Sequence, residues 1–208
     1  MQIVVLADVA SKEELLANGI REHTTLEWIQ QITDFEKYPN ADAWIDLLFE
    51  PVPSRIELLK KLTSGFVIVN SVTKTLRQID NSFVRINGWP TFLKRTIIEA
   101  SIAKVERKEI AEEIFTYFNR RVEWVQDEPG LVTPRIVSMI INEAYFALEE
   151  NISSKPEIDI AMKLGTNYPF GPFEWSKRIG LKNILDLLSN LEIISKRYAP
   201  SAQLKKEV

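Results

Sequence analysis

The chain has 208 residues, of which 45% are hydrophobic, so it is long enough to bury a sizeable core. Lys and Arg total 26 against 29 Asp and Glu, and this near balance gives no general field that would attract nucleic acid. There is no cysteine, which excludes disulfides, thiolate nucleophiles and cysteine-ligated metal centres.

The N-terminal half predicts strands that alternate with helices. Residues 3–7 form an apolar, β-branched run typical of a buried strand, and a helical sequence follows from Ser11. Further apolar runs lie at 44–49, 66–69, 83–86 and 97–102, with a helical pattern over 55–62. A helix over 106–121, with Ile110, Ile114 and Phe118 on one face, and a strand over 122–125 complete this half. The alternation predicts a largely parallel sheet covered by helices.

The C-terminal half predicts helices alone. One long helix carries Ile136, Met139, Ile140, Glu143, Ala144 and Ala147 at helical spacing, and no strand pattern follows it. Proline and glycine residues then divide the sequence into shorter helices. We therefore predict two domains, an α/β domain over 1–127 and an all-α domain over 128–208.

No stretch approaches the roughly 20 apolar residues that a membrane-spanning helix needs. The apolar run at 3–7 is too short for the core of a signal peptide and has no basic leader. We therefore expect no membrane association and a cytoplasmic location.

Four motifs of the C-terminal half resemble the helical domain of 3-hydroxyacyl-CoA dehydrogenases. They are Gly130-Leu131-Val132-Thr133-Pro134-Arg135, Asn142-Glu143-Ala144, Asp159-Ile160-Ala161-Met162-Lys163-Leu164-Gly165 and Tyr168-Pro169-Phe170-Gly171-Pro172-Phe173-Glu174. The N-terminal half is also similar over 42–50, 66–71 and 83–100. The resemblance, to the 3-hydroxybutyryl-CoA dehydrogenase type, implies a shortened Rossmann-like domain followed by a helical dimerisation domain, a homodimer and an acyl-CoA cleft used in fatty acid metabolism.

The nucleotide loop of this family is missing. A dinucleotide site needs Gly-x-Gly-x-x-Gly after the first strand, because only glycine lets the pyrophosphate reach the N–H groups of the helix. The chain has Leu6-Ala7-Asp8-Val9-Ala10-Ser11 there, and Ser11 with Glu14 has the spacing of a capping box. The stretch between Asp8 and Trp44 also leaves little room for the strand that should hold the ribose. We therefore expect no bound cofactor.

The proton-transfer pair of the family is only half present. The resemblance places Asn87 at the position of the catalytic histidine, and Glu99, twelve residues later, at that of the glutamate which orients it. A carboxamide does not titrate, so Asn87 cannot take a proton from the substrate. Asn87 is interpreted either as a strand-end turn residue or as a retained polar contact.

The substrate-binding positions are altered as well. The family's Ser-Ser-Leu loop corresponds to Lys74-Thr75-Leu76, and Pro134 replaces an asparagine. The resemblance leaves Asn70, Ser71 and Thr73 as candidate substrate-binding residues, with Thr73 or Thr75 standing in for the serine. Lys74 either pairs with a phosphate or thioester oxygen or is a solvated surface lysine. For metals, the carboxylates of Asp42, Asp46 and Glu50 are the remaining candidates, and we predict no metal site.

Two functions remain open. One is a homologue that lacks the dehydrogenase reaction but retains the dimer and an acyl-CoA cleft, as a sensor or as a partner of a related enzyme. The alternative is an active NAD-dependent 3-hydroxyacyl-CoA or 3-hydroxybutyryl-CoA dehydrogenase that uses Glu99 and an unrecognised base. A hydrolase or decarboxylase acting on CoA thioesters has no motif behind it. The simultaneous losses in the glycine loop, the histidine, the asparagine and the serine loop favour the first.

Overall fold

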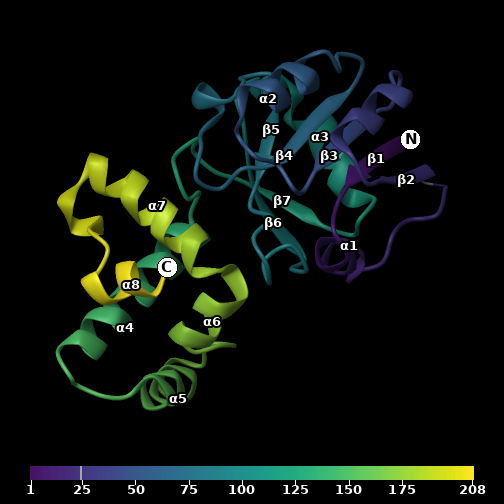
Figure 1. The fold of residues 1–208 in the computed structure, drawn as a ribbon. Coiled ribbons are helices and arrows are strands. Elements are labelled where there is room, and N and C mark those ends of the chain that lie inside the picture. Colours follow the sequence, from purple (N-terminus) through teal and green to yellow (C-terminus); the bar gives the residue numbers. More distant parts are fainter. Residues whose placement is uncertain (24) are drawn as a thin grey trace. The chain divides into compact units, whose positions relative to one another are not determined.

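This computed structural model describes residues 1–23 and 25–208. The chain divides into two compact units, Met1–Leu131 and Val132–Val208 (Figure 1). The first unit therefore continues four residues beyond the end of the predicted α/β domain. Each unit is considered by itself below.

The first unit is built on a seven-stranded sheet with the order β2-β1-β3-β4-β5-β6-β7. Strands β1 to β5 are parallel, β6 is antiparallel to β5, and β7 is parallel to β6. The largely parallel sheet predicted from the sequence is confirmed. The strands are β1 (Gln2–Leu6), β2 (Thr25–Ile29), β3 (Ala43–Asp46), β4 (Phe66–Asn70), β5 (Val84–Ile86), β6 (Ile97–Ile102) and β7 (Arg121–Trp124).

Helices cover both faces of this sheet, which explains why its central strands are apolar on both sides. On one face Ile3, Val5 and Ile45 pack in a core with Leu15 of α1 (Val9–Leu16) and with α3 (Lys108–Thr116). On the other face Val4, Leu6 and Trp44 form a second core with η1 (Ile32–Lys37) and α2 (Pro53–Lys60). Alternate residues of each strand thus enter different cores.

Helix α3 follows the 3-10 turn η3 (Val105–Arg107) and differs from its predicted face. Its buried residues are Ala111, Ile114 and Phe115, and Phe118 is buried just beyond its end. Ile110 shares the predicted helical spacing with Ile114 but is 54% exposed, so it lies outside the buried face. At 3.6 residues per turn, Ala111 and Phe115 lie one above the other and form the buried face together with Ile114. Ile110 lies at the edge of this face.

Strand β2 corrects a second expectation, because the short stretch between Asp8 and Trp44 does contain a strand next to β1. The usual Rossmann strand order is 3-2-1-4-5-6. The order β2-β1-β3-β4-β5 corresponds to it with the outermost strand removed, so the shortening leaves the ribose strand in place. The sheet is therefore Rossmann-like and reduced by one edge strand.

A buried arginine ties α1 to neighbouring segments. The Arg120 guanidinium is 2% exposed and donates to the carbonyl oxygens of Leu15 (2.6 Å), Glu14 (2.7 Å), Phe118 (2.8 Å) and Leu93 (3.0 Å). Burial lowers the pKa of Arg120 to about 10, with the Glu14 carboxylate opposing that shift, so the group stays charged at neutral pH. Arg120 thereby closes the C-terminal end of α1.

The second unit contains helices and no strands among its residues, all of which are described. They are α4 (Thr133–Glu149), α5 (Lys155–Thr166), α6 (Pro172–Ile179), α7 (Leu181–Ile194), η4 (Lys196–Tyr198) and α8 (Ala202–Glu207). Helix α4 packs against α6, α7 and α8, and buries Ile141 and Tyr145. The all-helical prediction for this half is confirmed.

The signature motifs of the second unit interlock at the corner between α5 and α6. Asp159 Oδ1 accepts the N–H of Phe173 at 2.8 Å and so caps α6, while Lys163 forms an ion pair with Glu174 at 2.6 Å. Glu174 also accepts the N–H of Gly171 at 3.1 Å. A Cβ at Gly171 would lie 2.2 Å from Asp159 Oδ1, so glycine is required by close packing.

The motif Asn142-Glu143-Ala144 holds the last helix of the chain in place through Asn142. The Asn142 side chain donates to the Ala199 carbonyl at 2.9 Å and accepts the N–H of Ser201 at 2.9 Å. Ser201 in turn caps α8 by accepting the N–H of Leu204 at 3.0 Å. Asn142 thereby fixes the start of α8 on α4.

Within the described residues, no helix is long and apolar enough to cross a membrane.

Candidate functional site

The carboxyl ends of the parallel strands form the candidate site, since ligands of open α/β sheets bind outside this edge. Asp8 follows β1, Asn70 ends β4 and Asn87 follows β5. The antiparallel strand β6 starts at the same edge and brings Glu99 there. Four residues from separate parts of the sequence are thus gathered at one edge of the sheet.

Asp8 occupies the N-terminus of α1, the point at which a dinucleotide pyrophosphate would bind. Its Oδ1 accepts the N–H of Ser11 at 2.7 Å, so Asp8 is the N-cap and the predicted cap by Ser11 and Glu14 is wrong. Asp8 rather than Ser11 is the cap because its extended backbone (φ −80°, ψ 177°) places its carboxylate over the N–H groups of the first helical turn. The carboxylate neutralises the helix end that a phosphate would otherwise use.

Glu14 has a different partner from the one its spacing suggested. Its Oε1 accepts the N–H of Thr91 at 2.7 Å, and Thr91 has a positive φ of 77°, which is rare for a β-branched residue. Glu14 therefore holds the loop between β5 and β6 against α1.

The end of β2 has no carboxylate where the ribose would be recognised. Gln30 and Gln31 follow Ile29, and the next acidic residue, Asp34, accepts the N–H of Gln31 at 3.3 Å and pairs with Lys37 at 2.7 Å. The Lys37 ammonium lowers the pKa of the Asp34 carboxyl. Asp34 is thus engaged within η1, and the strand end offers amide groups instead.

Asn87 and Glu99 lie opposite each other where β5 ends and β6 begins. The N–H of Asn87 donates to the Glu99 carbonyl at 3.0 Å. The Asn87 side chain is 3% exposed, and its Oδ1 accepts the N–H of Trp89 at 3.4 Å, a long contact across the turn after β5. Burial lowers the pKa of nearby Arg95, and the Glu99 carboxylate opposes that shift. The pair therefore consists of a carboxylate and a carboxamide, and the carboxamide carries no proton that it can exchange with a substrate.

The side-chain amide of Asn70 binds only backbone groups at the edge of the sheet. Its Nδ2 donates to the carbonyls of Leu47 (3.1 Å) and Gly88 (3.2 Å), and its Oδ1 accepts the N–H of Gly88 at 3.0 Å. A Cβ on Gly88 would lie 2.7 Å from Asn70 Cγ. Asn70 thus joins the ends of β3, β4 and β5, and these contacts occupy both donors and the acceptor oxygen of its amide.

Residues 71–78 form a loop, called here the β4 loop, which ends in the short 3-10 turn η2 (Leu76–Gln78). Ser71 Oγ donates to the Lys74 carbonyl at 3.0 Å, and the N–H of Thr75 donates to Gln78 Oε1 at 3.0 Å. Thr73 and Lys74 are half-buried. Across residues 1–23 and 25–208, the backbone N–H groups of Val72, Thr73 and Lys74 donate to no acceptor. These three successive donors are the candidates on this loop for binding an oxygen of a ligand.

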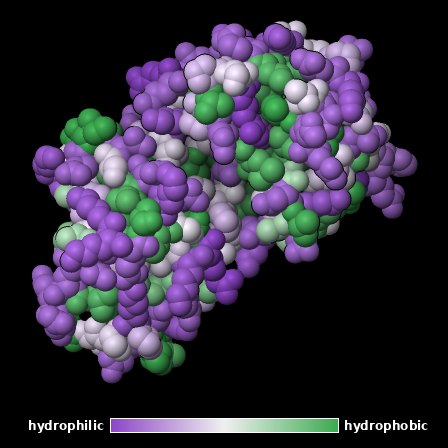
Figure 2. All heavy atoms as spheres, viewed as in Figure 1, coloured by the Kyte–Doolittle hydropathy of each residue, from purple (hydrophilic) through white to green (hydrophobic). Residues whose placement is uncertain are grey.

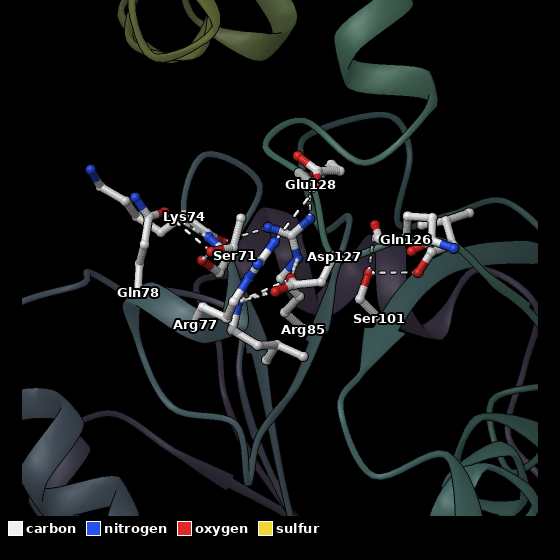
Figure 3. Close-up of polar contacts among 12 residues, drawn as sticks. Ser71, Lys74, Arg77, Gln78, Arg85, Ser101, Gln126, Asp127 and Glu128 are labelled. Atoms are coloured by element: carbon white, nitrogen blue, oxygen red, sulfur yellow. Dashed lines mark hydrogen bonds and ion pairs between the residues drawn. The ribbon is translucent and has the colours of Figure 1, made fainter. Parts of the chain in front are cut away.

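Arg85 lies beneath the β4 loop and was not singled out from the sequence. It is the one charged residue of the run Phe83-Val84-Arg85-Ile86, and this interruption of an apolar strand was the available signal. Figure 3 shows it between Lys74 and Glu128, with Asp127 beside it. Its Nε lies 3.1 Å from Asp127 Oδ1.

The carboxylates considered for a metal are scattered. Asp42 accepts the N–H of Gln2 at 2.7 Å, and Asp46 is buried against Arg55, with oxygen–nitrogen distances of 2.6 and 2.8 Å. Burial raises the pKa of Asp46, and Arg55 opposes that shift. Glu50 is exposed. No group of three or more potential metal ligands occurs in the described part of the chain.

The strand order and the polar groups at the carboxyl edge define the Rossmann-like class of nucleotide-binding folds. Residues 130–208 match the family model described as 3-hydroxyacyl-CoA dehydrogenase, C-terminal domain. The match confirms the resemblance inferred from the motifs of the helical half.

Two relatives illustrate how far the similarity extends. The chain is 44% identical over 84 residues to 3-hydroxyadipyl-CoA dehydrogenase of Escherichia coli, an alignment that covers 39% of this chain and 18% of the relative. It is 26% identical over 199 residues to 3-hydroxybutyryl-CoA dehydrogenase of Clostridioides difficile, covering 88% of this chain and 71% of the relative. The strong identity is thus confined to a small part of the first enzyme.

Solved structures agree on the fold. The crystal structure of (S)-3-hydroxybutyryl-CoA dehydrogenase from Ralstonia eutropha matches with a TM-score of 0.75 and 17% identity, and covers 99% of this chain and 92% of that one. A Mycobacterium tuberculosis protein, FadB2, matches with a TM-score of 0.77 and 15% identity over the same shares. At these low identities the two structures show a shared fold, while the sequence matches show that the chain is similar to 3-hydroxyacyl-CoA dehydrogenases, most strongly in its helical half.

Proposed function

We propose that this chain binds a 3-oxoacyl-CoA or 3-hydroxyacyl-CoA thioester and does not catalyse the NAD-dependent reaction of its relatives. The observation that carries the proposal is the Asp8 carboxylate, which accepts the N–H of Ser11 at 2.7 Å at the start of α1. A pyrophosphate needs the same N–H groups and would meet a like charge there. The residues present therefore do not fit the dinucleotide, and no step is derived through it.

The second support for this proposal is the chemistry at Asn87. Oxidising a 3-hydroxyl group requires a base that removes its proton, and a carboxamide has no such capacity at neutral pH. Loss of a general base typically lowers the rate about 10²–10⁴-fold. The nearby Glu99 contributes its backbone carbonyl to Asn87.

The positive part of the proposal, recognition of a thioester, rests on the β4 loop. The N–H groups of Val72, Thr73 and Lys74 are consecutive donors suited to a carbonyl oxygen, and the half-buried Lys74 adds a positive charge to the same loop. The named relatives act on CoA esters, which makes this ligand class the first to try.

The test is calorimetric titration of the purified protein with NADH, then with acetoacetyl-CoA. We expect saturable binding of the thioester and none of NADH. The variant Asp8→Gly should gain NADH affinity of about tenfold or more, because it frees the helix N-terminus. Asp80→Gly is the matched control, since Asp80 also accepts a backbone N–H, that of Ser82 at 2.7 Å, in an exposed turn of the same unit. Micromolar NADH binding by the unaltered protein would refute the proposal.

The second candidate function is an active NAD-dependent dehydrogenase. The observation in its favour is β2, which pairs with β1 over five residues and supplies the strand that holds a ribose in this class of fold. It predicts oxidation of NADH by acetoacetyl-CoA with the unaltered chain. Under the preferred proposal the unaltered chain does not oxidise NADH in this assay. Turnover is then expected only from the double variant Asp8→Gly/Asn87→His.

We also propose that the chain forms a homodimer through its helical unit. Ile160 and Leu164, one turn apart on α5, are exposed, Leu164 by 83%, and Ile193 and Ile194 are exposed at the end of α7. Figure 2 shows hydrophobic clusters among the hydrophilic residues of the helical unit. Light scattering should give twice the chain mass for the parent protein and a monomer for Leu164→Glu. Val105→Glu, at an apolar position of the sheet unit that is 63% exposed, should stay dimeric. A monomeric parent protein would refute the dimer.

A further inference from the structure

Arg85 is a fully buried charge of the first unit to which the chemistry above assigns no role. It lies in the middle of β5 and is 0% exposed. A guanidinium that has lost its hydration is stable only where its N–H groups find acceptors. The partners of Arg85 therefore indicate what it holds in place.

These partners come from two segments far apart in the sequence. The Nη1 of Arg85 donates to the Lys74 carbonyl at 2.6 Å, and its Nη2 donates to the Glu128 carbonyl at 2.5 Å. The Nε lies at ion-pair distance from Asp127, 3.1 Å, without the alignment of a hydrogen bond. Figure 3 shows the guanidinium between the β4 loop and residues 126–128. Arg85 thus bridges β5, the loop after β4 and the segment after β7.

The same segment holds the far side of the loop. Both carboxylate oxygens of Asp127 accept the N–H of Leu76, each at 3.0 Å, and the N–H of Gly130 donates to the Val72 carbonyl at 2.8 Å. The carbonyls of Val72 and Lys74 and the N–H of Leu76 are therefore all engaged. The donors that remain on this stretch are the N–H groups of residues 72–74, the ones assigned above to the ligand.

We infer that Arg85 and Asp127 are positioning residues of the β4 loop. They hold the carbonyl oxygens of residues 72 and 74 against the protein, so that the intervening N–H groups are kept together for an acceptor oxygen. The ligand named here, a CoA thioester, rests on the proposed function, whereas the conformation of the loop can be measured without it. Arg85 touches no ligand in this account and acts through Lys74.

The test uses the full chain and the variant Arg85→Met, which retains the length of an unbranched side chain but loses the donors. Hydrogen exchange of residues 72–76 is measured without ligand, and acetoacetyl-CoA is titrated by calorimetry. We expect exchange at Leu76 to become about tenfold faster and thioester affinity to fall about tenfold. Arg107→Met is the matched control, because Arg107 donates to the Gly65 carbonyl at the opposite end of β4 and should change neither quantity.

Two further variants separate positioning from general loss of structure. Arg85→Lys retains the charge but not the fork that reaches two carbonyls, so it should not restore the slow exchange. Asp127→Asn retains an oxygen for the Leu76 N–H and removes the ion pair, so it should give an intermediate rate, and it decides the question if Arg85→Met does not fold. Unchanged exchange over residues 72–76 in both Arg85→Met and Asp127→Asn overturns the inference. If exchange quickens as expected while the parent protein binds no thioester, the loop assignment stands and the proposed ligand is wrong.

Discussion

The two units treat their motif residues differently. In the helical unit Asp159, Gly171 and Glu174 are matched to the family and are joined to one another. In the sheet unit Asp8 and Asn87 lie at the carboxyl edge of the sheet, and both side chains accept N–H groups of their own chain. The motif residues of the helical unit thus join two helices, whereas Asp8 and Asn87 each bind a backbone N–H group close to them in the sequence.

This contrast changes how the family match should be interpreted. The family model matches residues 130–208. In this region the motif residues connect α5 to α6 and hold the start of α8 against α4. A match over these residues indicates the fold of the helical unit and does not indicate which chemistry the carboxyl edge of the sheet performs. The following variants test whether the difference between packing and chemistry holds.

The largest effect is expected in the sheet unit, from Arg120→Met. The change removes a guanidinium that serves four carbonyl groups and leaves buried acceptors without donors. We expect a loss of about 3–5 kcal/mol in the free energy of unfolding, measured by urea denaturation. Arg121→Met, at the exposed neighbouring position, should change it by less than about 0.5 kcal/mol. Equal effects of the two variants would show that the carbonyl contacts of Arg120 contribute nothing.

A pair of glycine variants tests the packing role of the helical signature. Gly171→Ala places a Cβ 2.2 Å from Asp159 Oδ1, so Asp159 must move and α6 loses its cap; we expect a loss of about 2–3 kcal/mol. Gly165→Ala, with nothing within 4 Å and a helical backbone, should instead stabilise the protein by about 0.5–1 kcal/mol. Thermal unfolding reports both, and the same sign for the two variants would contradict the packing argument.

Asn70→Asp tests whether this candidate ligand residue is structural. The variant replaces two donors by a carboxylate oxygen that faces the carbonyls of Leu47 and Gly88, and we expect a loss of about 1–2 kcal/mol. Asn81→Asp, on an exposed turn of the same unit, is the control and should be neutral. If Asn70→Asp leaves urea stability intact but abolishes thioester binding, Asn70 belongs to the chemistry and not to the packing.

The smallest effect concerns the N-terminus of α5. Hydrogen bonds from the Ser154 hydroxyl, the Ser154 N–H and the Ser153 hydroxyl lower the pKa of Glu157 from 4.5 to about 2. A carboxyl whose pKa is lowered by folding stabilises the protein above its unfolded pKa and loses that contribution as pH falls through its folded pKa. Glu157→Gln should therefore lower the melting temperature at neutral pH, and the difference from the parent protein should vanish towards pH 2. If the difference in melting temperature persists near pH 2, it does not come from the ionised Glu157 carboxyl.

Much of the fold could be predicted because its signals are local. The runs that became β1, β3 and β4 are buried on both faces, and their apolar sequence states this directly. Strand β2 was missed because it lies at the edge of the sheet, where Thr25 and Glu27 interrupt the apolar pattern. The exposure of Ile110 could not be predicted, because helical spacing alone does not select which of two adjacent rows of side chains packs against the sheet.

The candidate site was less predictable, because its contacts join distant segments. The neighbouring positions of Asn87 and Glu99 could be inferred from the family resemblance alone. The partner of Glu14 is 77 residues away, and the contact between Asp127 and Leu76 spans 51 residues, so no local pattern contains either one. Asp8 and Ser11 are both good cap residues, and only the backbone conformation decides between them.

The Arg120 contacts limit where residues can be inserted if α1 is redesigned as a nucleotide-binding helix. Because the carbonyls of Glu14 and Leu15 are fixed by the same guanidinium that binds Leu93, an insertion within the helix would turn this end away from its partners. An added glycine loop would have to be accommodated before Val9, in the connection from β1. The length of that connection, rather than the helix, is the adjustable part of the unit.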